Sequence, residues 1–147
     1  MELELSQLGS CEFYPPAENS TIRDAEKWMN TTFPKALKQL WKKSDGLYTD
    51  EGVLIYGAEQ IAERNQTWET ELYAEGYVAV GDDSGGKVLI MLAEAGAKDV
   101  WIVDGGSMSP DDGMHVTDHF IRWVNEGLEL GEPEEDEYID DDDDDLD

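Results

Sequence analysis

Basic residues are scarce in this 147-residue chain: 10 Lys and Arg stand against 36 Asp and Glu, giving a formal net charge of -26. Residues 132–147 hold 12 of the acids and no base, which leaves 24 acids against 10 bases, or -14, for residues 1–131. A field of this sign repels phosphate backbones and anionic membrane surfaces, and it speeds encounter with basic proteins. The composition argues against nucleic acid and membranes as partners and favours a basic protein.

Cysteine and long apolar runs are also nearly absent. Cys11 is the single cysteine, so no internal disulfide can form and a reducing compartment suits the chain. The opening Met-Glu-Leu-Glu-Leu-Ser lacks the basic and apolar regions of a secretory signal. No apolar run approaches the ~20 residues that a membrane helix needs. We therefore expect a cytoplasmic protein.

The motifs of common active sites are missing too. Asp83-Ser84-Gly85-Gly86 is similar to the segment around a serine-protease nucleophile, but both histidines follow this serine, whereas those proteases place their general base before it. His115 and His119 have a spacing that two metal ligands can use, yet no third histidine accompanies them. If Thr117 caps a helix, His115 lies in the preceding loop. No phosphate-binding glycine motif occurs. We expect no catalysis, no cofactor and no metal site.

The pattern of apolar residues predicts an α+β fold. Its spacing indicates helices that begin near Thr21, at Pro34, at Ala58 and after Thr117. Short runs rich in Val, Ile, Leu and aromatic residues indicate strands at 53–56, 77–80, 88–92 and 100–103. Helices followed by mostly sequential strands with short links favour an antiparallel sheet.

Each predicted helix has one face that should point into the core. The first helix takes Thr21 as its cap, and the third runs from about 58 to 72. The inward faces are Ile22, Ala25, Trp28 and Met29; Leu37, Leu40 and Trp41; Ile61, Asn65, Trp68 and Leu72; and Phe120, Ile121 and Val124. In the hairpin link at 81–86, Asp82 and Asp83 are typical turn residues whose side chains accept backbone N–H bonds.

Three segments divide the chain. Residues 1–20 contain Pro15-Pro16 and no clear period, so they form an irregular lead-in or a short edge element. Residues 21–130 make the single folded domain. Residues 131–147 include six consecutive aspartates, and such a block of like charges buries nothing, so we expect a disordered acidic tail.

Four successive motifs resemble the SUKH superfamily, which includes bacterial immunity proteins and fungal cell-wall regulators. The resemblance spans about 22–128. The motifs are FP at 33–34 before a helix that leads to SDG at 44–46; VLIYG at 53–57 before EQIAERN at 59–65; YVAVGDDSGG at 77–86 before an apolar strand; and VWIVD at 100–104 with FIRWV at 120–124. The resemblance implies a curved antiparallel sheet packed by helices, and a binding role. Bacterial members of this size typically hold a cognate toxin inactive.

Charge and resemblance together predict an immunity protein that occludes a basic toxin domain, such as a nuclease or deaminase, because acidic groups can fill a groove built for phosphates. The candidate interface residues, expected in loops, are Asp45, Tyr48, Asp50, Glu51, Asp82 and Asp83. The alternative is a cytoplasmic regulatory hub that binds several partners, with the acidic tail as the recruiting element.

Overall fold

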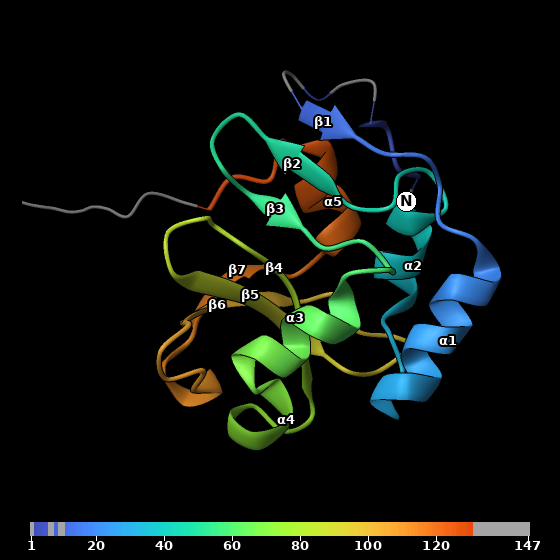
Figure 1. Cartoon of the computed structure of the whole chain (residues 1–147). Coiled ribbons are helices and arrows are strands. Elements are labelled where there is room, and N and C mark those ends of the chain that lie inside the picture. Colours follow the sequence, from blue (N-terminus) through green and yellow to red (C-terminus); the bar gives the residue numbers. More distant parts are fainter. Residues whose placement is uncertain (1, 6–7, 9–10, 131–147) are drawn as a thin grey trace, which may run out of the picture.

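The computed structural model describes residues 2–5, 8 and 11–130, so the acidic tail predicted at 131–147 lies outside the described residues. Within them the chain forms one antiparallel sheet of seven strands in sequence order (Figure 1). The strands are β1 (Cys11–Phe13), β2 (Leu47–Thr49), β3 (Leu54–Ile55), β4 (Tyr77–Asp82), β5 (Lys87–Leu92), β6 (Val100–Asp104) and β7 (Met114–Thr117). The predicted α+β class is confirmed.

Helices surround this sheet. They are α1 (Asn19–Met29), α2 (Lys35–Trp41), α3 (Ile61–Trp68), α4 (Thr70–Tyr73) and α5 (Phe120–Asn125), with a short 3-10 turn, η2 (Pro110–Asp112). In Figure 1, α1 and α2 lie to the right of the sheet, and α3 and α4 lie below it. None of the helices in the described ranges combines the length and the apolar composition needed to cross a membrane.

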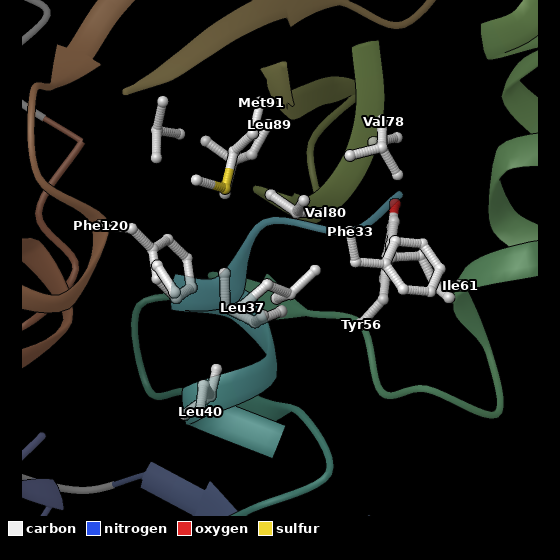
Figure 2. Packing of buried hydrophobic residues seen from close by; sticks show 14 of the residues in the cluster. Phe33, Leu37, Leu40, Tyr56, Ile61, Val78, Val80, Leu89, Met91 and Phe120 are labelled. Carbon is white, nitrogen blue, oxygen red and sulfur yellow. The ribbon is translucent and has the colours of Figure 1, made fainter. Parts of the chain in front are cut away.

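The core lies where α2 and α5 meet the central strands. Figure 2 shows Leu37 of α2 beside Leu89 and Met91 of β5, with Phe120 of α5 on the other flank. All four side chains are fully buried, and each such burial is worth about 1.5–3 kcal/mol. The inward faces predicted for these two helices are confirmed. Phe33, just before α2, packs edge-on against the Trp41 ring at 5.2 Å.

Asn65 joins helix α3 to the sheet. Strand β3 pairs with β4 only at Gly81 and Asp82, and the last contact beyond it is the bond from Tyr56 N to Val80 O. Along the rest of this edge of β4, no described strand lies next to it. There the Asn65 carboxamide accepts from Ala79 N at 2.8 Å and donates to Ala79 O at 3.0 Å. It also donates to Ile61 O at 2.8 Å. The side chain thus takes the place of a neighbouring strand and satisfies two buried backbone groups.

The single helix predicted at 58–72 is wrong, because the chain breaks at Glu69. This residue has φ 56°, a left-handed conformation that ends α3 and starts the separate turn α4. Ile61 and Asn65 face inward as predicted, but Leu72 lies beyond the break and is 67% exposed. A helical stripe predicts burial only while the helix continues.

The first helix differs from its prediction in two ways. It begins at Asn19 rather than near Thr21, its N-cap is Glu18, and no side chain caps it. Ile22 and Ala25 are buried as predicted, whereas Trp28 is 65% exposed. Six residues after Ile22 a helix has turned about 240° beyond a full turn, so Trp28 falls off the inward face.

Three short strands differ from the prediction: β2 and β7 were not predicted, and β1 is the short edge element that was one of two alternatives for residues 1–20. β1 lies within residues 1–20 and pairs with β2, and Leu3 from the same segment is buried in the core. The third, β7, follows the loop after β6 and pairs with β6 alone. None of the three exceeds four residues, which is too short to show a clear alternation.

Replacing Asn65 by Ala should lower the free energy of unfolding by about 2–4 kcal/mol, because the buried N–H and C=O of Ala79 lose their partner. Urea denaturation measures the change. The matched control is Gln66→Ala at the next, exposed position of α3, which should stay within about 0.5 kcal/mol of the parent. Equal losses in the two variants would contradict the role given to Asn65.

Candidate partner-binding surface

The six predicted interface residues divide into two groups in the structure. The carboxylates of Asp45, Asp82 and Asp83 are used inside the molecule, as hydrogen-bond acceptors for its own backbone and side chains. Tyr48, Asp50 and Glu51 are exposed at and after β2. The loop position is wrong for Tyr48, which lies in β2, and for Asp82, which is the last residue of β4.

Asp82 and Asp83 shape the β4–β5 hairpin. Asp82 Oδ1 accepts from Ser84 N at 2.9 Å, while Asp83 Oδ1 accepts from Gly85 N at 2.7 Å and from Lys87 N at 3.0 Å. These bonds let Ser84 hold a left-handed backbone with φ 63°. The turn role predicted for both aspartates is confirmed, and it uses Oδ1 of each carboxylate.

Asp82 has a second structural bond. Its Oδ2 accepts from the hydroxyl of buried Tyr56 at 2.7 Å, and that hydroxyl accepts from Trp68 Nε1 at 2.8 Å. Burial raises the pKa of Tyr56, and the hydrogen bond to Asp82 raises it further. The network therefore ties the end of β4 to α3 through groups that are satisfied only together.

Asp45 has a similar internal role at the start of β2. Its Oδ1 accepts from Ala58 N at 2.5 Å, which joins the segment after α2 to the segment before α3. The backbone of Gly57 lies so close that a Cβ atom there would be 2.5 Å from Asp45 O. Gly57 is therefore required for this close approach, as its place in the VLIYG motif suggests.

The remaining three residues form part of an outward surface. Tyr48 is 39% exposed and lies opposite Glu12 in the β1–β2 pairing. Asp50 and Glu51 follow in the β2–β3 turn, and both are exposed. Ser84 Oγ donates to Gly52 O at 2.7 Å, so this turn is fastened to the β4–β5 hairpin.

Two further residues of this surface, Glu12 and Tyr14, escaped the sequence analysis. Tyr14 lies two positions after Glu12 and is 38% exposed. Partial burial raises the pKa of Tyr14, and the nearby Glu12 carboxylate and Tyr48 raise it further. We call Glu12, Tyr14, Tyr48, Asp50 and Glu51 the acidic tyrosine patch. The adjacent aromatics Phe13 and Tyr14 were the available signal for a strand, but Pro15-Pro16 obscured it.

Neighbouring Cys11 reports the same electrostatic environment. Burial raises the pKa of the Cys11 thiol, and the carboxylates of Glu51 and Asp50 raise it further. Both acids therefore lie near β1 rather than pointing away from it. The patch concentrates negative charge beside two half-exposed tyrosine rings.

The two histidines have separate structural roles. His119, rather than Thr117, caps α5: its Nδ1 accepts from Arg122 N at 3.2 Å, while Thr117 Oγ1 accepts from His119 N. His115 lies in β7 rather than in a loop, and its Nε2 is 2.8 Å from Asp99 Oδ2. Among the described residues, no three side chains of metal-ligating type come together.

Comparison with known proteins identifies the family. Residues 16–126 match the model of the SMI1 / KNR4 family (SUKH-1), and because this match covers more than half of the chain, the chain belongs to that family. Domains of this family are generally associated with toxin immunity and are immunity proteins rather than enzymes. No curated protein matches the chain. The resemblance drawn from the four sequence motifs is confirmed.

Tyr56→Phe should make the protein less sensitive to alkaline pH. The folded pKa of Tyr56 is raised above the ordinary value of 10.0, so above pH 10 the unfolded chain loses a proton that the folded chain keeps. The contribution of Tyr56 to the free energy of unfolding is fully present below pH 10 and falls as the pH rises. Tyr56→Phe removes this pH-dependent contribution, so the decrease of the free energy of unfolding with pH becomes shallower by up to about 1.4 kcal/mol per pH unit.

Urea unfolding between neutral pH and about pH 11 tests this slope. At neutral pH the variant should already be about 1–2 kcal/mol less stable, because Trp68 Nε1 and Asp82 lose a buried partner. Tyr73→Phe, at an exposed tyrosine, is the matched control. Parallel curves for the parent and Tyr56→Phe would contradict the assignment.

Proposed function

We propose that this protein is a cytoplasmic immunity protein that holds a cognate toxin inactive by covering a basic surface of the toxin domain. Nucleases and deaminases that act on nucleic acids need such basic surfaces, so the toxin is of this class. Neutralisation needs no chemistry from the immunity protein. Binding alone withholds the toxin surface from its substrate.

The acidic tyrosine patch is the observation that supports this proposal. Its carboxylates have no hydrogen-bond partner within the described residues, whereas those of Asp45, Asp82 and Asp83 do. Unpaired surface carboxylates steer a basic partner during diffusion and can raise association rates to about 10⁸–10⁹ M⁻¹s⁻¹ at low salt. Tyr14 and Tyr48 supply rigid aromatic anchors of the kind that dominates binding energies.

The carboxylates and the tyrosines of the patch contribute differently to binding. Exposed ion pairs contribute only about 0–1 kcal/mol each, because water and salt screen them. A desolvated tyrosine anchor can be worth about 2 kcal/mol or more. The carboxylates therefore set the association rate, and the tyrosines set the lifetime of the complex.

Tyr14→Ala combined with Tyr48→Ala should abolish or strongly reduce rescue of growth when the protein is co-expressed with its cognate toxin domain. Loss of both anchors should weaken the complex by about tenfold or more. Tyr73→Ala, an equally large truncation of an exposed tyrosine on α4, is the matched control and should rescue fully. Circular dichroism and thermal unfolding establish that the variants fold.

One further arm of this experiment separates immunity from the hub alternative. Removing 132–147 should leave rescue intact if the domain surface neutralises the toxin. Rescue that depends on these residues, together with unaffected rescue by the tyrosine variant, would contradict the proposal and favour a hub that recruits through its tail.

Asp50→Asn combined with Glu51→Gln should slow association with the toxin domain by about two- to tenfold at low ionic strength, with a smaller effect at high salt. Stopped-flow fluorescence measures the rate. The neutral control is Glu63→Gln with Glu71→Gln, at exposed acids of α3 and α4. An unchanged rate in the first variant, or an equal decrease in both, would remove the patch as the steering group.

A further inference from the structure

Strand β7 is a free edge of the sheet. The strand order follows the sequence from β1 to β7, so β7 pairs with β6 on one side, and no described strand lies on its other side. An edge strand directs unpaired backbone N–H and C=O groups outward, and these groups accept an added strand from another chain. Many proteins protect an edge strand by covering it with another segment or by placing charged side chains on it. The residues next to β7 do neither completely.

An open groove of about 430 Å³ lies between this edge strand and the segment of α5 and the residues after it. One wall is formed by consecutive residues of β7, His115 to Thr117, and the other by Arg122 and Trp123 of α5 and its C-cap Glu126. Trp123 is only 4% exposed, so it forms part of the floor, and its Nε1 is satisfied by Glu129 O. The groove therefore combines a strand edge with an aromatic floor.

The charge of this groove is negative. Its single described cation, Arg122, forms an ion pair with Asp118 four residues earlier. The carboxylates of Glu126 and Glu129 also line the groove, and neither has a hydrogen-bond or ion-pair partner within the described residues. Glu126 is the C-cap of α5, where a carboxylate faces the negative end of the helix and lowers its stability. Helix stability does not explain its presence.

We propose that this groove binds an extended, basic segment of a protein partner as an additional strand beside β7. Backbone hydrogen bonds to the free edge would supply affinity, and basic side chains on one face of the segment would meet Glu126 and Glu129. The apolar stems of these basic side chains would lie over the Trp123 floor, and the alternate side chains would point to the opposite face of the sheet. The proposal rests on the proposed function only in assuming that the partner is a basic protein.

Other occupants fit less well. The acidic residues 132–147 carry the same sign as the groove and would be repelled. A second copy would bring Met114–Thr117 beside itself, a strand that has no Lys or Arg for Glu126 or Glu129 and whose His115 already contacts Asp99. Charge complementarity therefore favours a basic partner over either of these.

The test uses the full chain, labelled with ¹⁵N, and an acetylated peptide of alternating Lys and Val. Binding should shift amide resonances of β7 and α5 and slow hydrogen exchange in β7. The same peptide with Glu in place of Lys should not bind. Neither should a peptide with N-methyl groups on alternate residues, which keeps the charge but prevents strand pairing.

Charge-reversal variants complete the test. Glu126→Lys with Glu129→Lys should weaken peptide binding by about tenfold, whereas Glu63→Lys with Glu71→Lys should leave it unchanged. Equal binding of the N-methylated peptide, shifts centred on the acidic tyrosine patch, or equal loss in both variants would overturn the proposal. The proposal would also be overturned if the β7 amides of the free protein were already protected from hydrogen exchange by a dimer, which sedimentation would detect. The same holds if the chain's own tail protected them, which deletion of the tail would reveal.

The peptide measurement stands apart from toxin rescue. If the peptide binds as expected and the toxin is not neutralised, the strand-binding groove is supported and the immunity role is contradicted. If the toxin is neutralised and the peptide does not bind, the immunity role is supported and the strand-binding groove is contradicted.

Discussion

The Asn65 carboxamide occupies the place where a strand would otherwise continue the sheet. The position of the candidate surface depends on the hydrogen bonds that this side chain makes there. Its bonds to Ala79 N and O fix α3 against the edge of β4. Fixing α3 in turn places Trp68, whose Nε1 reaches the hydroxyl of Tyr56, and that hydroxyl holds Asp82. Since buried polar groups are costly when any one partner is lost, these contacts stabilise one arrangement of α3 and β4 rather than several.

From Asp82 the chain of contacts continues to the surface. Asp82 and Asp83 shape the β4–β5 hairpin, and Ser84 in that hairpin binds the carbonyl of Gly52 in the β2–β3 turn. Asp50 and Glu51 belong to that same turn. The acids used internally therefore position the acids left free, which explains how residues of one charge can serve two purposes within a short distance.

Much of the framework could be predicted because it depends on local patterns. The apolar runs that became β4, β5 and β6, and the stripe of α2, are long enough for periodicity to show. The short strands β2 and β7 could not, since neither exceeds four residues, and β1 was only one of two alternatives for residues 1–20. The break at Glu69 was hidden because a left-handed residue other than glycine or asparagine leaves little trace in sequence.

The candidate site was only partly predictable, because it also depends on contacts between residues far apart in the sequence. The sequence identifies acidic turn residues, but whether a carboxylate is free depends on tertiary neighbours: Asp82 meets Tyr56 from 26 positions away, while Asp50 meets no described donor. Because β1 and β7 do not pair with each other, the sheet of the described residues has two edges, at β1 and β7. A partner bound at either edge would need no rearrangement of the core, since its side chains are already buried among the strands and helices. The exposed edge residues can therefore change with little effect on stability, whereas Asn65 and Gly57 are constrained by their contacts with Ala79 and Asp45.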